Sequence, residues 1–154
     1  MKHLRIALIM MLFAFNFSAF AQQKDEEEAI KKTINQLFDG MRKSDSTLVR
    51  GAFNQGAILQ TIGKTKEGNA VVRSTDLTAF IASIAKPHPE IYDERIVFTK
   101  ILIDANLASV WTDYKFYIGE KFSHCGVNSF QMVKTEKGWK IVYLIDTRRK
   151  ENCN

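Results

Sequence analysis

The hydrophobic pattern between residues 25 and 45 is that of an amphipathic helix. Apolar residues recur at spacings of three and four, which places them on one helical face. Acidic residues 25–28 precede this stripe, and Arg42 and Lys43 follow it, as the helix dipole favours. The stripe consists of Ile30, Thr33, Ile34, Leu37, Phe38 and Met41. We expect this face to cover a hydrophobic core.

The segment up to residue 86 predicts two further helices and one hairpin. Asp45 can cap a short helix over 46–53. Two apolar segments, 57–62 and 69–74, are joined by the polar link GKTKEG and predict paired strands. A third helix is expected after Thr75, with its apolar residues on one side, and a proline-containing loop follows it.

From Glu90 onward the apolar period changes to two. Four long strands are predicted, over residues 90–104, 106–119, 121–134 and 138–149. The links DAN, GEK and TEKG are short, as antiparallel hairpins require. The chain is therefore predicted to be an α+β protein, in which a strongly curved antiparallel sheet of an N-terminal hairpin and four long strands wraps about three helices.

This order of elements resembles the nuclear transport factor 2-like superfamily, whose cone-shaped fold is shared by ketosteroid isomerase and the SnoaL-like cyclases. The resemblance covers the chain from residue 22 to 154. It includes Asp45 before the short helix, Ala57–Leu59 entering the first strand, and GWKI at 138–141. The string from Ser123 to Cys153 is similar to exported bacterial members. The resemblance implies ligand binding at the open mouth of the cone, but the superfamily hosts enzymes, binders and association domains alike.

Strand register predicts which side chains enter the cone. A hairpin loop at 119–121 pairs Phe116 with His124 and lays the Tyr114 ring over the bare backbone of Gly126. Pairing Lys134 with Trp139 in the last hairpin puts Thr147 on the same face, and Asp113 and Asp146 on the opposite one. A small-molecule site is therefore expected at the polar end of an apolar face. Its predicted ligand-binding residues are Thr112, Tyr114, His124, Asn128 and Thr147.

His124 has three interpretations. It can bind a ligand, it can act as an acid–base group with an ordinary pKa of about 6.5, or it can simply be satisfied by the backbone near the rim. Catalysis needs an orienting acid, and this register leaves none on the face of His124. The aspartate base of ketosteroid isomerase has no counterpart that we can match to a residue of this chain.

Adjacent strand residues point to opposite faces, so Cys125 is expected on the convex side, away from His124. It lies laterally near residue 148, and Cys153 follows on the C-terminal tail. We expect a Cys125–Cys153 disulfide, against the alternative of a buried thiol and a free tail. No metal site is predicted, because His88 has no ligand spacing to its neighbours, and no cofactor is expected.

Trp111 and Val127 are expected on the convex face of the sheet. A tryptophan there has no core to enter, and in the resembled superfamily the outer sheet face commonly packs against a second subunit. A homodimer interface is therefore predicted, with a solvent-exposed tryptophan as the alternative.

The N-terminus has the pattern of a secretory signal peptide. A short basic region precedes an apolar run at residues 6–17, and the small-x-small signal AFA predicts cleavage between Ala21 and Gln22. The run is short against the ~20 residues of a membrane helix, so no stable membrane anchor is expected. We predict an exported protein, periplasmic or secreted, with 1–21 as signal peptide and 22–154 as one domain.

Charge and composition add little that is specific. The net charge of +5 arises without a long basic run, so nucleic acid is not an expected partner. The favoured function is an exported small-molecule-binding protein. The alternatives are an isomerase, dehydratase or cyclase-type enzyme using His124, and a non-catalytic dimerisation or association module.

Overall fold

The structure is a computed structural model that describes residues 2–87 and 89–153, with side chains from residue 22 onward. Three helices and six strands follow one another in the predicted order. They are α1 (Lys2–Lys43), α2 (Ser46–Ala52), β1 (Phe53–Lys64), β2 (Ala70–Thr75), α3 (Leu77–Ala85), β3 (Tyr92–Asp104), β4 (Leu107–Ile118), β5 (Lys121–Thr135) and β6 (Gly138–Thr147). The α+β class is confirmed.

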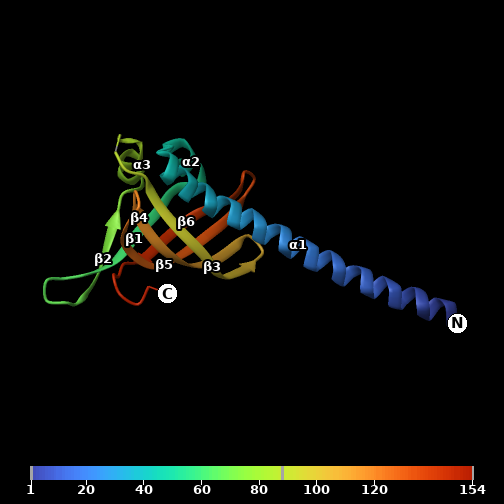
Figure 1. Cartoon of the computed structure of the whole chain (residues 1–154). Coiled ribbons are helices and arrows are strands. Elements are labelled where there is room, and N and C mark those ends of the chain that lie inside the picture. Colours follow the sequence, from blue (N-terminus) through green and yellow to red (C-terminus); the bar gives the residue numbers. More distant parts are fainter. Residues whose placement is uncertain (1, 88, 154) are drawn as a thin grey trace.

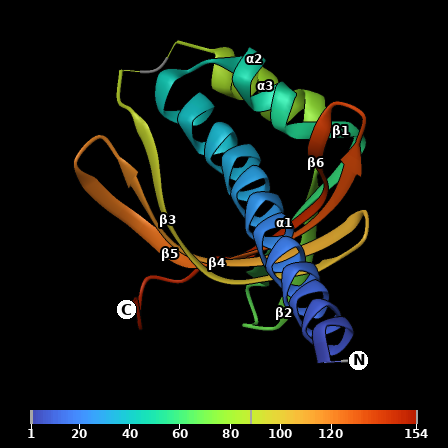
Figure 2. The ribbon, with the colours of Figure 1, turned by 90° about the vertical axis from the view of Figure 1, so that its right-hand side faces the viewer.

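The six strands form one curled sheet in the order β2-β1-β6-β5-β4-β3. Figure 2 shows this sheet curving around α1, with α2 and α3 beside the end of that helix. Every neighbouring pair is antiparallel except β1 and β6, which run parallel. The sheet is therefore mixed rather than wholly antiparallel. The hairpin links that fix direction elsewhere do not join β1 to β6, so no sequence signal sets their relative direction.

The predicted stripe on α1 packs against the concave face of the sheet. Ile30, Ile34 and Leu37 are buried there, and the rings of Phe38 and Phe130 meet edge to face with centroids 6.4 Å apart. The sheet contributes the buried residues Val110, Phe130, Met132, Trp139 and Ile141. Burial of this apolar surface is the main stabilising contribution to such a fold.

The cap at the start of α2 forms as expected. One carboxylate oxygen of Asp45 accepts hydrogen bonds from the backbone N–H groups of Thr47 and Leu48, at 2.9 and 3.0 Å. These bonds satisfy donors that a helix leaves unpaired at its N-terminus. The cap fixes the turn between α1 and α2, and so helps to close one end of the concave face.

The predicted register between β4 and β5 is confirmed over the segment that carries the candidate site. Tyr114 pairs with Gly126, and Phe116 pairs with His124. His124 therefore lies on the concave side of the sheet, and Cys125 on the convex side.

The register of β6 departs from the prediction halfway along the strand. Met132 pairs with Ile141, but Gln131 pairs with Tyr143, so β6 contains one extra residue at Val142. Such a β-bulge reverses the facing of every later residue. The predicted facing of Tyr143 and of all later β6 residues is therefore wrong.

The bulge exchanges an aspartate for a threonine on the concave face. Asp146 now points into the cone, and Thr147 points to the convex side, where its hydroxyl oxygen accepts a hydrogen bond from the backbone N–H of Val127 at 3.2 Å. The predicted positions of both side chains are thus wrong. This exchange decides the chemistry of the site.

The N-terminal part of α1 extends beyond the sheet, as Figure 1 shows. The later part of the same helix carries the stripe that packs on the core. Among the described residues, no helix is long and apolar enough to cross a membrane.

Candidate functional site

A cavity of about 230 Å³ opens between α1, α3 and the concave face of the sheet. Most of its wall is apolar and comes from all three of these parts of the fold. The apolar wall residues are Leu37, Phe38, Met41, Leu59, Phe80, Ile84, Tyr92, Phe116 and Leu144. At one end the wall becomes polar, where β1, β3, β5, β6 and the segment after β6 contribute Thr61, Glu94, His124, Asn128, Asp146 and Arg148. A cavity of this kind, apolar with a few convergent polar groups, suits a small organic ligand.

Glu94 and Asn128 form the first polar pair of the site. The Asn128 amide nitrogen donates to a Glu94 carboxyl oxygen at 2.8 Å and lies 3.4 Å from the Thr112 hydroxyl oxygen. Asn128 and Thr112 are both buried. Thr112 therefore lies behind the cavity wall and holds the amide, while Glu94 and Asn128 face the cavity.

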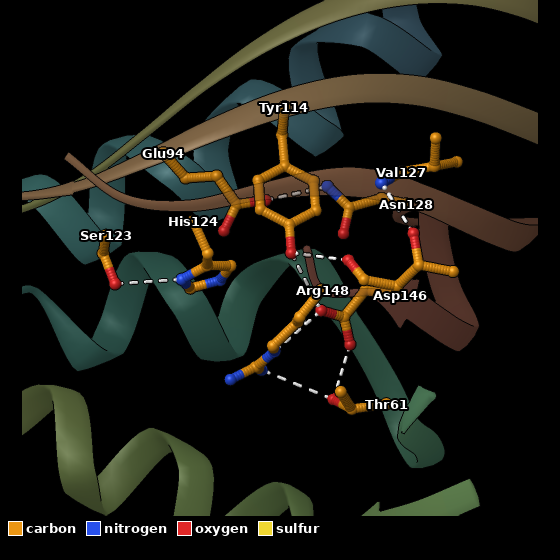
Figure 3. A network of polar contacts seen from close by, with 10 residues as sticks. Thr61, Glu94, Tyr114, Ser123, His124, Val127, Asn128, Asp146 and Arg148 are labelled. Carbon is orange, nitrogen blue, oxygen red and sulfur yellow. Dashed lines mark hydrogen bonds and ion pairs between the residues drawn. The ribbon is translucent and has the colours of Figure 1, made fainter. Parts of the chain in front are cut away.

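Asp146 is the centre of the second polar group, which Figure 3 shows in full. Its carboxylate accepts hydrogen bonds from the Thr61 hydroxyl at 2.5 Å, from Arg148 Nε at 2.9 Å and from the Tyr114 hydroxyl at 3.2 Å. The Arg148 guanidinium also reaches the Thr61 hydroxyl oxygen at 3.3 Å. Four side chains from three strands and the segment after β6 are thus held in one arrangement.

Tyr114 supports this group from behind the cavity. Its ring crosses Gly126, and its hydroxyl also reaches the carbonyl oxygen of Thr147 at 2.8 Å. A side chain at residue 126 would block that path, because a Cβ there would lie 1.8 Å from the Thr147 carbonyl oxygen and 2.7 Å from the Tyr114 ring. The glycine therefore allows Tyr114 to reach β6 and position Asp146.

His124 lies at the rim between aromatic rings. Its imidazole packs edge-on to Tyr114, with centroids 5.6 Å apart, and at a tilt to Phe116, with centroids 5.1 Å apart. Nδ1 is 3.0 Å from the Ser123 hydroxyl oxygen, and the other ring nitrogen, Nε2, has no hydrogen-bond partner among the described residues. Burial, helped by the positive charges of Arg148 and Lys150, lowers the pKa of His124, so the imidazole is neutral at neutral pH.

Burial also shifts the pKa values of other titratable groups of the site. Burial raises the pKa of Glu94 to about 7. The hydrogen bond from Asn128 opposes this rise, and the negative charge of Asp146 adds to it. Burial and the same carboxylates raise the pKa of Tyr114 far above its ordinary value, so the phenol remains a hydrogen-bond donor. Burial alone would lower the pKa of Arg148, but Asp146 outweighs it and the pKa is raised. The site thus combines a fixed cation with a carboxyl group that titrates near neutral pH.

We expect the contribution of Glu94 to stability to fall as the pH rises from about 5 to about 7 and to level off above that. A carboxyl group whose pKa is raised in the folded state stabilises the fold below its unfolded pKa of about 4.5, and this contribution is lost as the pH rises through about 7. Glu94→Gln should therefore lose less stability between pH 5 and pH 8 than the unmodified protein, by on the order of 2 kcal/mol. Urea unfolding at both pH values measures this difference. Asp113→Asn, on the exposed face, is the control, and identical pH profiles for the unmodified protein and Glu94→Gln would contradict the assignment.

The structure brings together only part of the predicted site. His124 and Asn128 line the cavity. Tyr114 and Thr112 lie on the concave face but behind the wall, where they position Asp146 and Asn128. Thr147 lies on the convex side. The ligand-binding roles of these residues stay predictions.

The predicted ligand-binding set did not include Thr61, Glu94, Asp146 and Arg148 at the polar end of the cavity, nor Gln60, Thr75 and Ser83 elsewhere in its wall. The sequence does contain a sign of Glu94. It lies two residues from each of the apolar residues Tyr92 and Ile96 on β3, and so shares their face of the sheet. The expectation that no acid shares the face of His124 is therefore wrong. Among the described residues, no group of three or more histidine, cysteine or acidic side chains is arranged to hold a metal ion.

The cysteines behave as predicted. Cys125 is buried on the convex side and is joined to Cys153 by a disulfide, with Cα atoms 5.8 Å apart. Backbone hydrogen bonds between Cys125 and Arg149, at 2.9 and 2.8 Å, hold the start of the tail against the same strand. The disulfide therefore fastens the C-terminal tail to β5. This tail begins directly after Arg148, which lies at the mouth of the cavity.

Residues 25–144 match the family described as "Putative lumazine-binding". The chain belongs to this family. The match spans α1 from its acidic segment to the middle of β6, and so includes the cavity apart from Asp146 and Arg148. No protein of curated function matches the chain.

Solved structures of other proteins share this fold. A nuclear transport factor 2-like protein of unknown function from Shewanella baltica is 18% identical, with a TM-score of 0.62, over 82% of this chain and 96% of that one. A nuclear transport factor 2-like protein with a cystatin-like fold from Novosphingobium aromaticivorans is 11% identical, with a TM-score of 0.70, over 89% of this chain and 90% of that one. At these identities the likeness shows the fold alone, and the predicted nuclear transport factor 2-like fold is confirmed.

Proposed function

We propose that this protein binds a small planar heterocycle of the lumazine class in the cavity. The observation that carries this proposal is the cavity itself, whose aromatic and aliphatic wall ends in a cluster of hydrogen-bonding groups. Membership in a family described as lumazine-binding points to the same class of ligand.

The chemistry of lumazine suits both parts of the cavity. Its fused rings present flat apolar faces, which aromatic wall residues such as Phe80 and Phe116 can contact. One edge carries two carbonyl groups flanking an N–H. The carbonyl oxygens need hydrogen-bond donors, and the N–H needs an acceptor. His124, Asn128 and Glu94 can supply these, and Glu94 can do so as a donor below pH 7 or an acceptor above it.

Substitutions at the polar end should weaken lumazine binding. We expect His124→Ala and Asn128→Ala each to raise the dissociation constant by about tenfold, since each removes hydrogen bonds made inside a partly desolvated site. Tyr114→Phe should weaken binding less, by displacing Asp146. Isothermal titration calorimetry measures the constants, and thermal unfolding confirms that each variant is folded.

The matched control is Asp113→Asn, which removes an acid from the exposed side of the same strand as Tyr114. Its affinity should equal that of the unmodified protein. Lumazine binding that is indifferent to both His124→Ala and Asn128→Ala would place the site elsewhere.

A second candidate function is proton transfer to or from a bound heterocycle. The specific observation is that Glu94 faces the cavity with a pKa of about 7, which suits a general acid or base. Here Glu94, rather than the predicted His124, is the acid–base group, because the described partner of the imidazole is the Ser123 hydroxyl. Deuterium exchange at the methyl groups of 6,7-dimethyllumazine tests it: exchange should be faster with the protein than with Glu94→Gln, and equal rates would contradict it.

The convex face is our candidate for self-association. Trp111 is 49% exposed there, close to the exposed Leu102, while Val127 is half-buried. Exposed apolar groups on a sheet face favour a protein–protein contact, which supports the predicted homodimer. Sedimentation velocity of the protein and of Trp111→Lys tests this proposal, and a monomer at all concentrations would contradict it.

Export is the proposed location of the protein. The Cys125–Cys153 disulfide is typical of oxidising compartments, and the apolar segment before Gln22 has the pattern of a signal peptide. Mass spectrometry of the native protein should find a chain that begins at Gln22. A retained segment 1–21 would contradict this prediction.

A further inference from the structure

A second hollow continues from the polar end of the cavity. This groove has a volume of about 520 Å³ and shares four wall residues with the cavity: Tyr92, Phe116, His124 and Arg148. Beyond His124 it runs along Ser123 and the segment after β6. A ligand larger than the cavity would therefore extend into this groove.

The charge of the groove differs from that of the cavity. The cavity end carries the carboxyl groups of Glu94 and Asp146, whereas the groove is lined by Arg148, Arg149 and Lys150 and by no described acidic residue. The charge of Arg148 is balanced by Asp146 at 2.9 Å. Among the described residues, the Lys150 ammonium has no hydrogen-bond or ion-pair partner.

The segment that carries these cations is held in place. Backbone hydrogen bonds join Arg149 to Cys125, the Cys125–Cys153 disulfide fastens the tail a few residues later, and Arg149 Nε donates to the carbonyl oxygen of Asn152 at 3.2 Å. The cations therefore lie on a fixed rim rather than on a free tail, which lowers the entropy lost when a ligand binds.

We propose that the groove holds an anionic substituent, a carboxylate or a phosphate monoester, of the heterocycle that fills the cavity. The inference rests on the proposed function and makes it more specific. The rings would lie against the apolar wall, and the anion would pass His124 to reach Lys150. Placed this way, the ligand meets the hydrogen-bonding groups at the polar end of the cavity and the cations just beyond them.

A pair of ligands that differ by one charge tests the proposal. We expect 6-carboxylumazine to bind about three- to tenfold more tightly than lumazine at low ionic strength, and the difference to narrow at high salt. In Lys150→Gln this difference should shrink. The matched control is Lys137→Gln, in the β5–β6 turn at the opposite end of β5 from His124, where the difference should persist. An equal loss in both lysine variants would overturn the proposal, because it would reflect net charge alone.

Phenyl phosphate separates this proposal from the proposed function. It carries an anion and a ring but lacks the hydrogen-bonding edge of lumazine, so phosphorus NMR reports on the groove independently. Binding that Lys150→Gln weakens and Lys137→Gln leaves intact supports the groove, even if lumazine itself does not bind and the proposed function fails. Absence of phenyl phosphate binding, or equal affinities for the two lumazines, overturns the inference.

Discussion

Replacing Gly126 with alanine is expected to lower the free energy of unfolding by about 3 kcal/mol or more. The added Cβ would lie 1.8 Å from the carbonyl oxygen of Thr147 and 2.7 Å from the Tyr114 ring. The first of these atoms is backbone, so β5 and the end of β6 would have to move apart. That movement would also break the hydrogen bond from Tyr114 to the Thr147 carbonyl. Urea unfolding followed by circular dichroism measures the loss.

Gly63→Ala is the matched control for this substitution. Gly63 also lies within a strand, but a Cβ there would meet only the end of the flexible Arg73 side chain, at 3.3 Å. Its effect should stay within about 1 kcal/mol. If Gly126→Ala were as stable as this control, the packing of Tyr114 across Gly126 would be wrong, and with it the support of Asp146.

Loss of the disulfide is the second large effect. We expect Cys153→Ser to lower the free energy of unfolding by roughly 3–4 kcal/mol, because the bond closes a long loop and restricts the unfolded chain. The two cysteines are 28 positions apart, and they are the two cysteines of the chain. A domain of this size is stabilised by only ~5–15 kcal/mol in total. Chemical denaturation of the variant and of the oxidised protein measures the difference.

The oxidised protein treated with a reducing agent serves as the control, and its stability should match that of Cys153→Ser. Alkylation under denaturing, non-reducing conditions should modify neither cysteine of the native protein. Two modified thiols, or equal stability of variant and oxidised protein, would contradict the disulfide.

Local patterns predicted the helices and most of the sheet because each carries its own periodicity. The stripe from Ile30 to Met41 has the spacing of a helical face, and its residues are buried as expected. The β4–β5 register was predicted correctly from Phe116 and His124 onward, because the apolar and polar residues of the two strands match. The predicted loop at 119–121 is wrong, since Ile118 pairs with Lys121 and a bulge at Ser123 restores the predicted pairing. The facing of His124 and Cys125 followed from it and is confirmed.

The second half of β6 could not be placed in the same way. Residues 141–145 read IVYLI, an unbroken apolar run in which no polar residue marks the phase. An extra residue at Val142 therefore leaves no trace in the sequence, although it turns Asp146 into the cone. Glu94 was overlooked for a related reason, since it stands among Asp93 and Arg95 and only its phase with Tyr92 sets it apart.

The parallel pairing of β1 and β6 also depends on the whole fold. It brings Thr61 beside Asp146 from a distant part of the chain. Such long-range pairs are set by the closure of the sheet and not by local preference. The sequence therefore predicted where the candidate site lies and that His124 and Asn128 line it. It did not predict the acidic and basic side chains of the site.

The most direct test of the central claim, that the cavity binds a lumazine-class heterocycle, is chemical-shift mapping of isotope-labelled protein titrated with lumazine. We predict saturable shifts that are largest at His124, Asn128 and Glu94, and negligible shifts at Trp111 on the convex face. Shifts that cluster around Trp111 and leave His124 and Asn128 unchanged would contradict the claim.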